Sequence, residues 1–176
     1  MPHLSAVMTP MANSAEVGEI VAATQRWLER AVIGLNLCPF AKAVHVKKQI
    51  RYAETDQEVL DTTLLIHPQV MGNFLDFHFF LAEANAAIRK LGFEGVFQIA
   101  SLHPQYEFAG SDADDIDNFS NRSPYPTLHL LREASIDRAV AAFPDAADIF
   151  ERNIETLQGL GHEGWRQLWL DQPPKS

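Results

Sequence analysis

Two apolar runs that end in the same three letters constrain the fold of this chain most. TTLLIHP at 62–68 and GVFQIASLHP at 95–104 both continue into Gln, so each run ends in His-Pro-Gln. The segment 71–91 between them is long and periodic enough for a helix, and Gly92 suits its C-cap. A strand, a helix and a strand at this spacing predict a βαβ unit, whose two strands run parallel through a right-handed crossover.

The rest of the chain extends this unit to a single α/β or α+β domain with one sheet of about four strands. We expect a helix from Ser14 to Gly34, a strand at 44–52, a strand at 127–133 and a helical C-terminus with a break near 159–161. A helix stays an alternative for 127–133. The expected organisation is a disordered leader at 1–13, a globular domain at 14–170 and a tail at 171–176.

Composition excludes several classes of function. The formal net charge is -9 and no basic stripe is visible, so a nucleic-acid partner is not expected. No apolar run reaches the ~18 residues that a membrane span needs, so no membrane partner is expected either. The N-terminus lacks the features of a secretory signal, and a single cysteine fits a reducing compartment. The expected location is the cytoplasm.

His67 and His103 are the first candidate site residues. If their strands are parallel, both histidines lie at the same edge of the sheet, where ligands of open α/β sheets bind. Neighbouring strands are about 4.8 Å apart, so we expect the two side chains within about 10 Å of each other. A histidine before a proline also serves simply to end a strand. For the pair together, we favour acid/base catalysis, because imidazole titrates near neutral pH.

A long segment without helical or strand periodicity, residues 105–126, begins at the same edge. Loops of this length in compact domains are usually functional or disordered. Because it carries Tyr106, Phe119 and Tyr125, we expect an ordered and packed wall of the site. Its acidic run does not fit a calcium loop, since Ile116 stands where an oxygen ligand is required. No metal ligand is assigned, and whether a cofactor is needed stays open.

Further candidate residues follow from this placement. We expect Asp115 to orient an imidazole, and Arg122 to hold a small anionic ligand through its planar guanidinium. The remaining candidates for substrate binding are Tyr106, Asn121 and Arg132. Arg132 has a second interpretation, an ion pair with Glu133 at the end of the loop.

Cys38 in LNLCPFAK also has two interpretations. A lone cysteine between Leu37 and Pro39 is usually buried for packing. It is a candidate nucleophile only if His67 or His103 lies near enough to lower its pKa.

Several of these motifs together resemble a known family. IGLNLCPFAK, TTLLIHP, FQIASLHPQYEFAG and NRSPYPTLHLLREAS are similar to the bacterial family known as domain of unknown function 1415, over about residues 15–168. The resemblance implies no reaction, because the family has no established activity. Members carry a longer helical segment where this chain has only ETDQEVLD, which implies a less covered edge or face of the sheet.

Three functions from different classes remain open. The preferred one is a small cytoplasmic enzyme that acts on an anionic small molecule by histidine acid/base chemistry. The alternatives are a non-catalytic metal- or ligand-binding module, and an adaptor that docks a protein on the 105–126 loop. The oligomeric state is left open by the sequence.

Overall fold

The computed structural model describes residues 3–8, 14–35, 37, 60–142 and 148–168. Within them the chain forms a mixed α+β fold with one sheet and a helical C-terminal part. The strands are β1 (His3–Met8), β2 (Leu60–Ile66), β3 (Phe97–Leu102) and β4 (Thr127–Arg132), and the larger helices are α1 (Ser14–Trp27), α3 (Phe74–Lys90), α4 (Glu133–Ala142) and α5 (Ile149–Gln167). Two short helical segments complete the set, η1 (Leu28–Ile33) and the 3₁₀ helix η3 (Ile116–Asn121).

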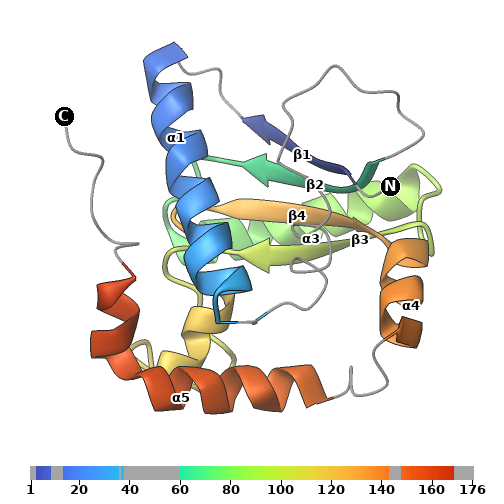
Figure 1. The fold of residues 1–176 in the computed structure, drawn as a ribbon. Coiled ribbons are helices and arrows are strands. Elements are labelled where there is room, and N and C mark those ends of the chain that lie inside the picture. Colours follow the sequence, from blue (N-terminus) through green and yellow to red (C-terminus); the bar gives the residue numbers. More distant parts are fainter. Residues whose placement is uncertain (1–2, 9–13, 36, 38–59, 143–147, 169–176) are drawn as a thin grey trace.

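The sheet corrects the expected βαβ unit. β2, β4 and β3 lie side by side in this order as antiparallel neighbours, and β1 pairs in parallel with the outer side of β2. The prediction that β2 and β3 are neighbouring parallel strands is therefore wrong. β4 comes after both strands in the chain, but in the sheet it lies between them and forms hydrogen bonds with each. Because each is antiparallel to β4, β2 and β3 still run in the same direction (Figure 1).

Helices cover both faces of the sheet, as the nearly continuous apolarity of its strands requires. α1 lies on one face and α3 on the other (Figure 1). On the α1 side Ile20 packs against Leu64 and Ile66, which alternate along β2 and are almost fully buried. Burying each such aliphatic side chain contributes about 1.5–3 kcal/mol.

A second apolar cluster joins α1 and η1 to the C-terminal helix. Trp27, Ala31 and Val32 pack there with Leu157 and Trp165 of α5. Because η3 contributes Ile116 and Phe119 to the edge of this cluster, the predicted loop is built into the core rather than left as a linker.

The helix ends follow from local sequence. Asn73 caps α3 by accepting from the backbone N–H groups of Leu75 and Asp76, and Gly92 after its C-cap has a positive φ of 76°. The expected break in the last helix is confirmed at Gly161, whose φ of 63° and ψ of 175° interrupt α5.

Other expectations differ from the structure or fall outside it. Residues 3–8, expected within a disordered leader, form β1, and Thr127–Arg132 form a strand rather than the alternative helix. α4 begins at Glu133, the last residue of the strand expected at 127–133. The expected strand at 44–52 lies outside the described residues. No helix among the described residues is long and apolar enough to cross a membrane.

Candidate functional site

His67 and His103 lie at the same end of the sheet, on either side of the start of β4. Thr127 pairs with Ile66 of β2 and with Leu102 of β3, so each histidine directly follows a residue paired to Thr127. The backbone N–H of His67 donates to the carbonyl of Pro126 at 2.9 Å. Two strand spacings separate the two backbones, about 10 Å. The shared end of the sheet, inferred from the repeated motif, is thus confirmed, although the two strands are not neighbours.

Both imidazoles face α3 and contact one row of aromatic side chains on it. Phe74, Phe77 and Phe80 are spaced by three residues and so lie along one side of the helix. The ring of His103 lies 5.3 Å from that of Phe74 and 5.1 Å from that of Phe77, and the ring of His67 lies 5.8 Å from Phe80 in an edge contact. This row holds both histidines on the same face of the sheet.

His103 is fully buried and its two ring nitrogens are both used. Nδ1 accepts from the backbone N–H of Gln105 at 2.9 Å, so Nδ1 carries no proton. Nε2 must then carry the proton, and it donates to the carbonyl of Met71 at 3.0 Å. Burial lowers the pKa of His103, against the opposing effect of the Met71 carbonyl. The ring is therefore a neutral link between the two loops that leave β2 and β3.

His67 is also buried, and burial lowers the pKa of its imidazole below the usual value. A neutral imidazole at neutral pH is the form that accepts a proton. The ring stands edge-on to Phe80, and Pro68 directly follows it. Contact between His67 and a ligand requires movement of the side chains that cover this ring.

The 105–126 loop is organised by Asn118, which is fully buried. Its Oδ1 accepts from the backbone N–H of Phe108 at 2.9 Å and from the hydroxyl of Ser111 at 2.8 Å. Its Nδ2 donates to the carbonyl of Asp112 at 2.8 Å. One amide thus fixes three positions of the loop to the first turns of η3.

Arg122 fastens the same loop from its other end. The guanidinium donates from Nε to the carbonyl of Tyr106 at 3.3 Å and from Nη2 to the carbonyl of Ala113. Its central carbon lies 4.1 Å above the ring of Phe119, a cation–π contact. The predicted anion-binding residue therefore has a clear structural task within the described part of the chain.

The other predicted site residues of the loop are placed differently. Tyr106 packs its ring 5.4 Å from Phe74, the residue that also contacts His103, and so belongs to the histidine cluster. Asn121 accepts from the backbone N–H of His103 through its carbonyl at 3.2 Å. The carboxylate of Asp115 accepts from the backbone N–H of Asp112 at 2.8 Å and is exposed.

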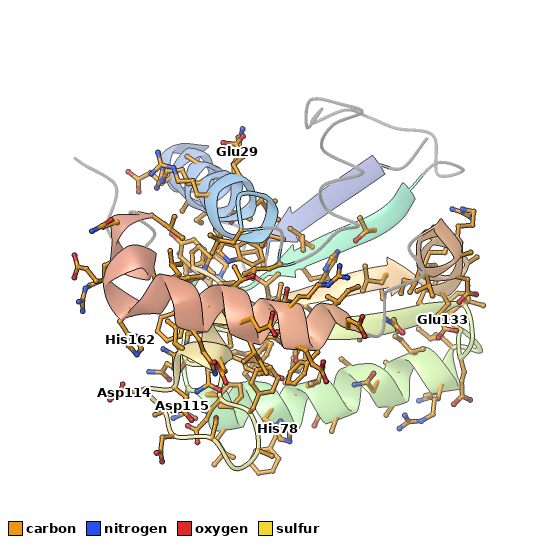
Figure 2. All side chains as sticks on the ribbon, turned by 60° about the horizontal axis from the view of Figure 1, so that its bottom comes forward. Glu29, His78, Asp114, Asp115, Glu133 and His162 are labelled. Carbon is orange, nitrogen blue, oxygen red and sulfur yellow. The ribbon has the colours of Figure 1, made fainter. Side chains whose placement is uncertain are left out.

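Figure 2 shows where the acidic side chains of the 105–126 loop lie. Asp114 and Asp115 project from the loop at the end of the molecule where His162 of α5 and His78 of α3 also lie, while Glu133 lies at the opposite end of the sheet. In the part of the chain that the structure describes, no group of three or more His, Cys, Asp or Glu side chains is arranged to hold a metal ion.

Arg132 and Cys38 are not brought to the histidines. Arg132 pairs with Phe97 at the start of β3 and lies five residues along β4 from Thr127, about 17 Å away. Its guanidinium lies 5.0 Å from the centre of the Phe97 ring. Cys38 lies outside the described residues.

His129 is a third histidine of the sheet and lies partly buried on its α1 side. Its Nε2 forms a short hydrogen bond with the hydroxyl of Thr62, and that hydroxyl also donates to the carbonyl of Leu130. With the hydroxyl proton used, Nε2 of His129 is the donor. Burial lowers the pKa of His129 from 6.5 to about 4.

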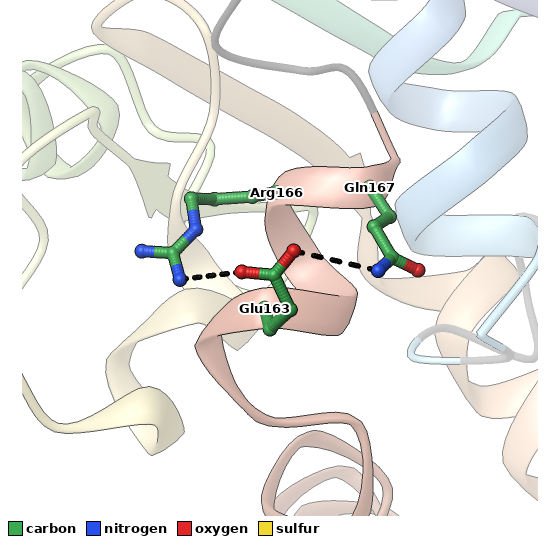
Figure 3. Close-up of polar contacts among 3 residues, drawn as sticks. All are labelled: Glu163, Arg166 and Gln167. Atoms are coloured by element: carbon green, nitrogen blue, oxygen red, sulfur yellow. Dashed lines mark hydrogen bonds and ion pairs between the residues drawn. The ribbon is translucent and has the colours of Figure 1, made fainter.

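α5 holds the loop from outside. Phe119 stands edge-on to Trp165 at 5.2 Å and to His162 at 5.4 Å, and Gln158 donates to the carboxylate of Asp117. One turn further, Glu163 pairs with Arg166 at 2.7 Å and accepts from Gln167 (Figure 3). The hydrogen bond from Arg166 lowers the pKa of the Glu163 carboxyl. This exposed ion pair supports the helix itself rather than the site.

Two residues that are important for the geometry of the site, Asn118 and Met71, belong to none of the sequence motifs described above. Asn118 was one of several polar residues in an acidic run, and the only sequence signal for its role is an amide among turn-forming residues. Met71 has a φ of 60°, unusual for a residue with a side chain. From the sequence, a left-handed conformation would be expected at the next residue, Gly72, because glycine adopts it without steric cost.

Comparison with known proteins identifies the family. No curated protein and no solved structure matches the chain significantly. The model of a family described as "Protein of unknown function (DUF1415)" matches residues 19–60 and 53–167, which is most of the chain. The resemblance seen in the sequence motifs is thus confirmed: the chain belongs to the DUF1415 family.

Proposed function

We propose that the protein is a small cytoplasmic enzyme that transfers a proton to or from an anionic small molecule, with the imidazole of His67 as the general acid and base. The observation that carries the proposal is that two buried histidines, each with a lowered pKa, lie at one end of the sheet. His103 uses both ring nitrogens on backbone groups of the adjoining loops. His67 shares its aromatic support and is held neutral by burial, which suits a base.

In this mechanism His103 is a positioning residue. Its hydrogen bonds to Met71 and Gln105 fix the β2–α3 loop and the start of the 105–126 loop, and these loops flank His67. The aromatic row of α3 fixes the planes of both rings. A base held in one orientation loses little entropy when substrate binds, which is how such packing favours proton transfer.

Arg122 supports the site by holding its wall and by supplying positive charge. Two of its donors bind loop carbonyls, and its position above Phe119 keeps the guanidinium within the loop. The guanidinium is always charged, and this positive charge supports attraction of a carboxylate or phosphate beside the loop. The ring of Tyr106, which contacts Phe74 next to His103, lies where it can orient such a ligand.

The test combines a ligand screen with two variants. Carboxylated and phosphorylated metabolites are screened against the full chain by thermal shift, and each hit is assayed for turnover by proton NMR. We expect His67→Gln to lower turnover of a hit by 10²–10⁴-fold, the usual contribution of a general acid or base, with little change in melting temperature. We expect His103→Gln to lower the melting temperature clearly.

Two results would contradict this mechanism. One is a hit that binds with a defined stoichiometry but never turns over, which would favour the non-catalytic ligand-binding module. The other is turnover that survives His67→Gln unchanged. Arg132→Gln is the matched control, because Arg132 lies at the far end of β4 and its replacement leaves turnover unchanged.

A further inference from the structure

The outer face of α3 carries an apolar stripe that is exposed among the residues the structure describes. We define this outer stripe as Leu75, Phe79, Ala82 and Ala86, whose spacing of four, three and four residues places them in one line along the helix. All four are exposed, and Leu75 and Phe79 retain 60% and 64% of their accessible surface. Phe77, on the opposite side, is the buried residue of this helix.

The position of α3 leaves the outer stripe accessible. The helix forms the outer layer on its side of the sheet, and in the part of the chain that the structure describes no other helix lies over it (Figures 1 and 2). A surface helix needs only one apolar side to pack on the core, so the second apolar side of α3 is not needed for folding. Exposed apolar stripes bordered by polar residues mark interaction sites.

Charges along the border of the stripe indicate what covers it. Asp76, Glu83 and Lys90 are exposed and seven residues apart, so they form one row beside the outer stripe. The row is acidic near the N-terminus of the helix and basic at its C-terminus. An antiparallel second copy of α3 places the acidic end of one row against the basic end of the other, and their helix dipoles also oppose.

We propose that two copies of this chain associate through α3, with the two outer stripes packed antiparallel about a twofold axis near Glu83 and Ala84. In this register Ala82 packs on Ala86 of the second copy, and Asp76 of each copy faces Lys90 of the other. The two alanines allow a close approach of the helix backbones, and the rings of Phe79 fill the space on either side of the axis. A self-complementary patch of this kind closes at two copies.

The pairing cannot be satisfied within one chain. Asp76 and Lys90 are fourteen positions apart, about 21 Å along a helix, so their side chains do not meet in the monomer. The proposal is independent of the chemistry of His67, because the outer stripe lies on the side of α3 that faces away from both histidines.

The experiment measures the mass of the full chain by sedimentation velocity from about 5 to 500 µM. We expect a monomer–dimer equilibrium that Phe79→Ser weakens at least tenfold. Phe150→Ser is the matched control, because Phe150 is a phenylalanine on α5 with 55% of its surface exposed. It leaves the equilibrium unchanged. Circular dichroism verifies that both variants are folded.

Charge reversal tests the antiparallel register. Asp76→Lys and Lys90→Asp each replace two attractive pairs by repulsive ones, so each weakens association about tenfold at low salt. The double variant restores the attraction and the dimer. Glu83→Gln removes the like charges nearest the axis and tightens association.

Several outcomes would overturn the proposal. A wild-type chain that stays monomeric over the whole range excludes the dimer, as does a dimer that Phe150→Ser disrupts and Phe79→Ser does not. A double charge variant that is no better than either single variant rules out the antiparallel pairing. Binding of the monomer to vesicles of anionic phospholipid through Phe79 assigns the outer stripe to a lipid surface instead.

Discussion

His103 donates a hydrogen bond from Nε2 to the carbonyl of Met71, a residue with a side chain that the structure holds at a φ of 60°. A left-handed conformation costs about 1–2 kcal/mol for such a residue and persists only where surrounding contacts fix it. The buried imidazole supplies one of these contacts and at the same time accepts from Gln105. The pair thus joins the loop after β2 to the loop after β3.

Replacement of His103 by alanine is expected to destabilise the fold by about 2–4 kcal/mol, because it leaves a cavity and removes the hydrogen-bond partner of the Met71 carbonyl and of the Gln105 N–H. Urea denaturation followed by circular dichroism measures the change. His78→Ala is the matched control, because His78 is an exposed histidine on α3 and its replacement should change stability by less than about 0.5 kcal/mol. Equal effects of the two variants would contradict a structural role for His103.

Met71→Gly is expected to stabilise the chain slightly or leave it unchanged, although the substitution removes a whole side chain. Glycine adopts a positive φ without steric cost, which offsets the loss of packing. Thermal unfolding measures the effect. A loss of several degrees in melting temperature would mean that packing of the Met71 side chain, rather than its backbone conformation, is what this position contributes.

Asn118→Ala is expected to cost about 2–4 kcal/mol and to open the 105–126 loop to protease, because three hydrogen bonds in a fully buried position are lost. Limited proteolysis with mapping of the first cut measures the opening. Asn118→Asp is the more specific variant, since it keeps the acceptor of Phe108 and Ser111 and replaces the donor to Asp112 by a second acceptor. A wild-type cutting pattern in both variants would remove Asn118 as the organiser of the loop.

Gly161→Ala and Gly159→Ala form a matched pair on α5. Gly161 has φ 63° and ψ 175°, a conformation that is essentially restricted to glycine, so its replacement is expected to cost about 1–3 kcal/mol. Gly159 has open space around its Cα and no positive φ, so alanine there should stabilise the helix by up to about 1 kcal/mol. Opposite shifts in melting temperature are predicted, and shifts of the same sign would contradict the observed kink.

Stability is expected to fall as the pH is lowered from 6.5 toward 4. Folding lowers the pKa of His129 from 6.5 to about 4, so the unfolded chain binds more protons in this window and acid favours unfolding. The difference between the two values corresponds to roughly 3 kcal/mol. The lowered pKa values of His67 and His103 act in the same direction. Urea denaturation at several pH values should show a shallower dependence in His129→Gln, and an unchanged dependence would contradict this assignment.

Much of the fold was predictable from local patterns. The apolar runs, the cap after α3 and the glycine break in α5 follow from periodicity and backbone preferences, which act over a few residues. The order of the strands was not predictable in this way. Whether β4 pairs beside or between β2 and β3 depends on packing of the whole sheet, and the apolar run at 127–132 has no local feature that distinguishes the two arrangements.

The candidate site was predictable in part for the same reason. Two strands that end in His-Pro and run in one direction bring His67 and His103 to one end of the sheet, whatever lies between them. The hydrogen bonds of each ring depend on contacts distant in sequence, such as that between His103 and Met71. The same holds for Arg122, whose carbonyl partners lie nine and sixteen residues away along the loop.

The central claim is that the two histidines at this end of the sheet differ in role, with His103 as a positioning residue and His67 as the proposed general acid and base. Imidazole ¹⁵N NMR of the full chain, assigned with His67→Gln and His103→Gln, tests it most directly. We predict that His103 is the neutral Nε2–H tautomer at pH 7, that its pKa lies below the ordinary imidazole value because the ring is buried, and that ligand does not affect it. His67 is predicted to be neutral at pH 7 and to shift when an anionic metabolite from the screen is added. A His103 ring that titrates like a free imidazole, or ligand shifts at His103 with none at His67, would contradict the claim.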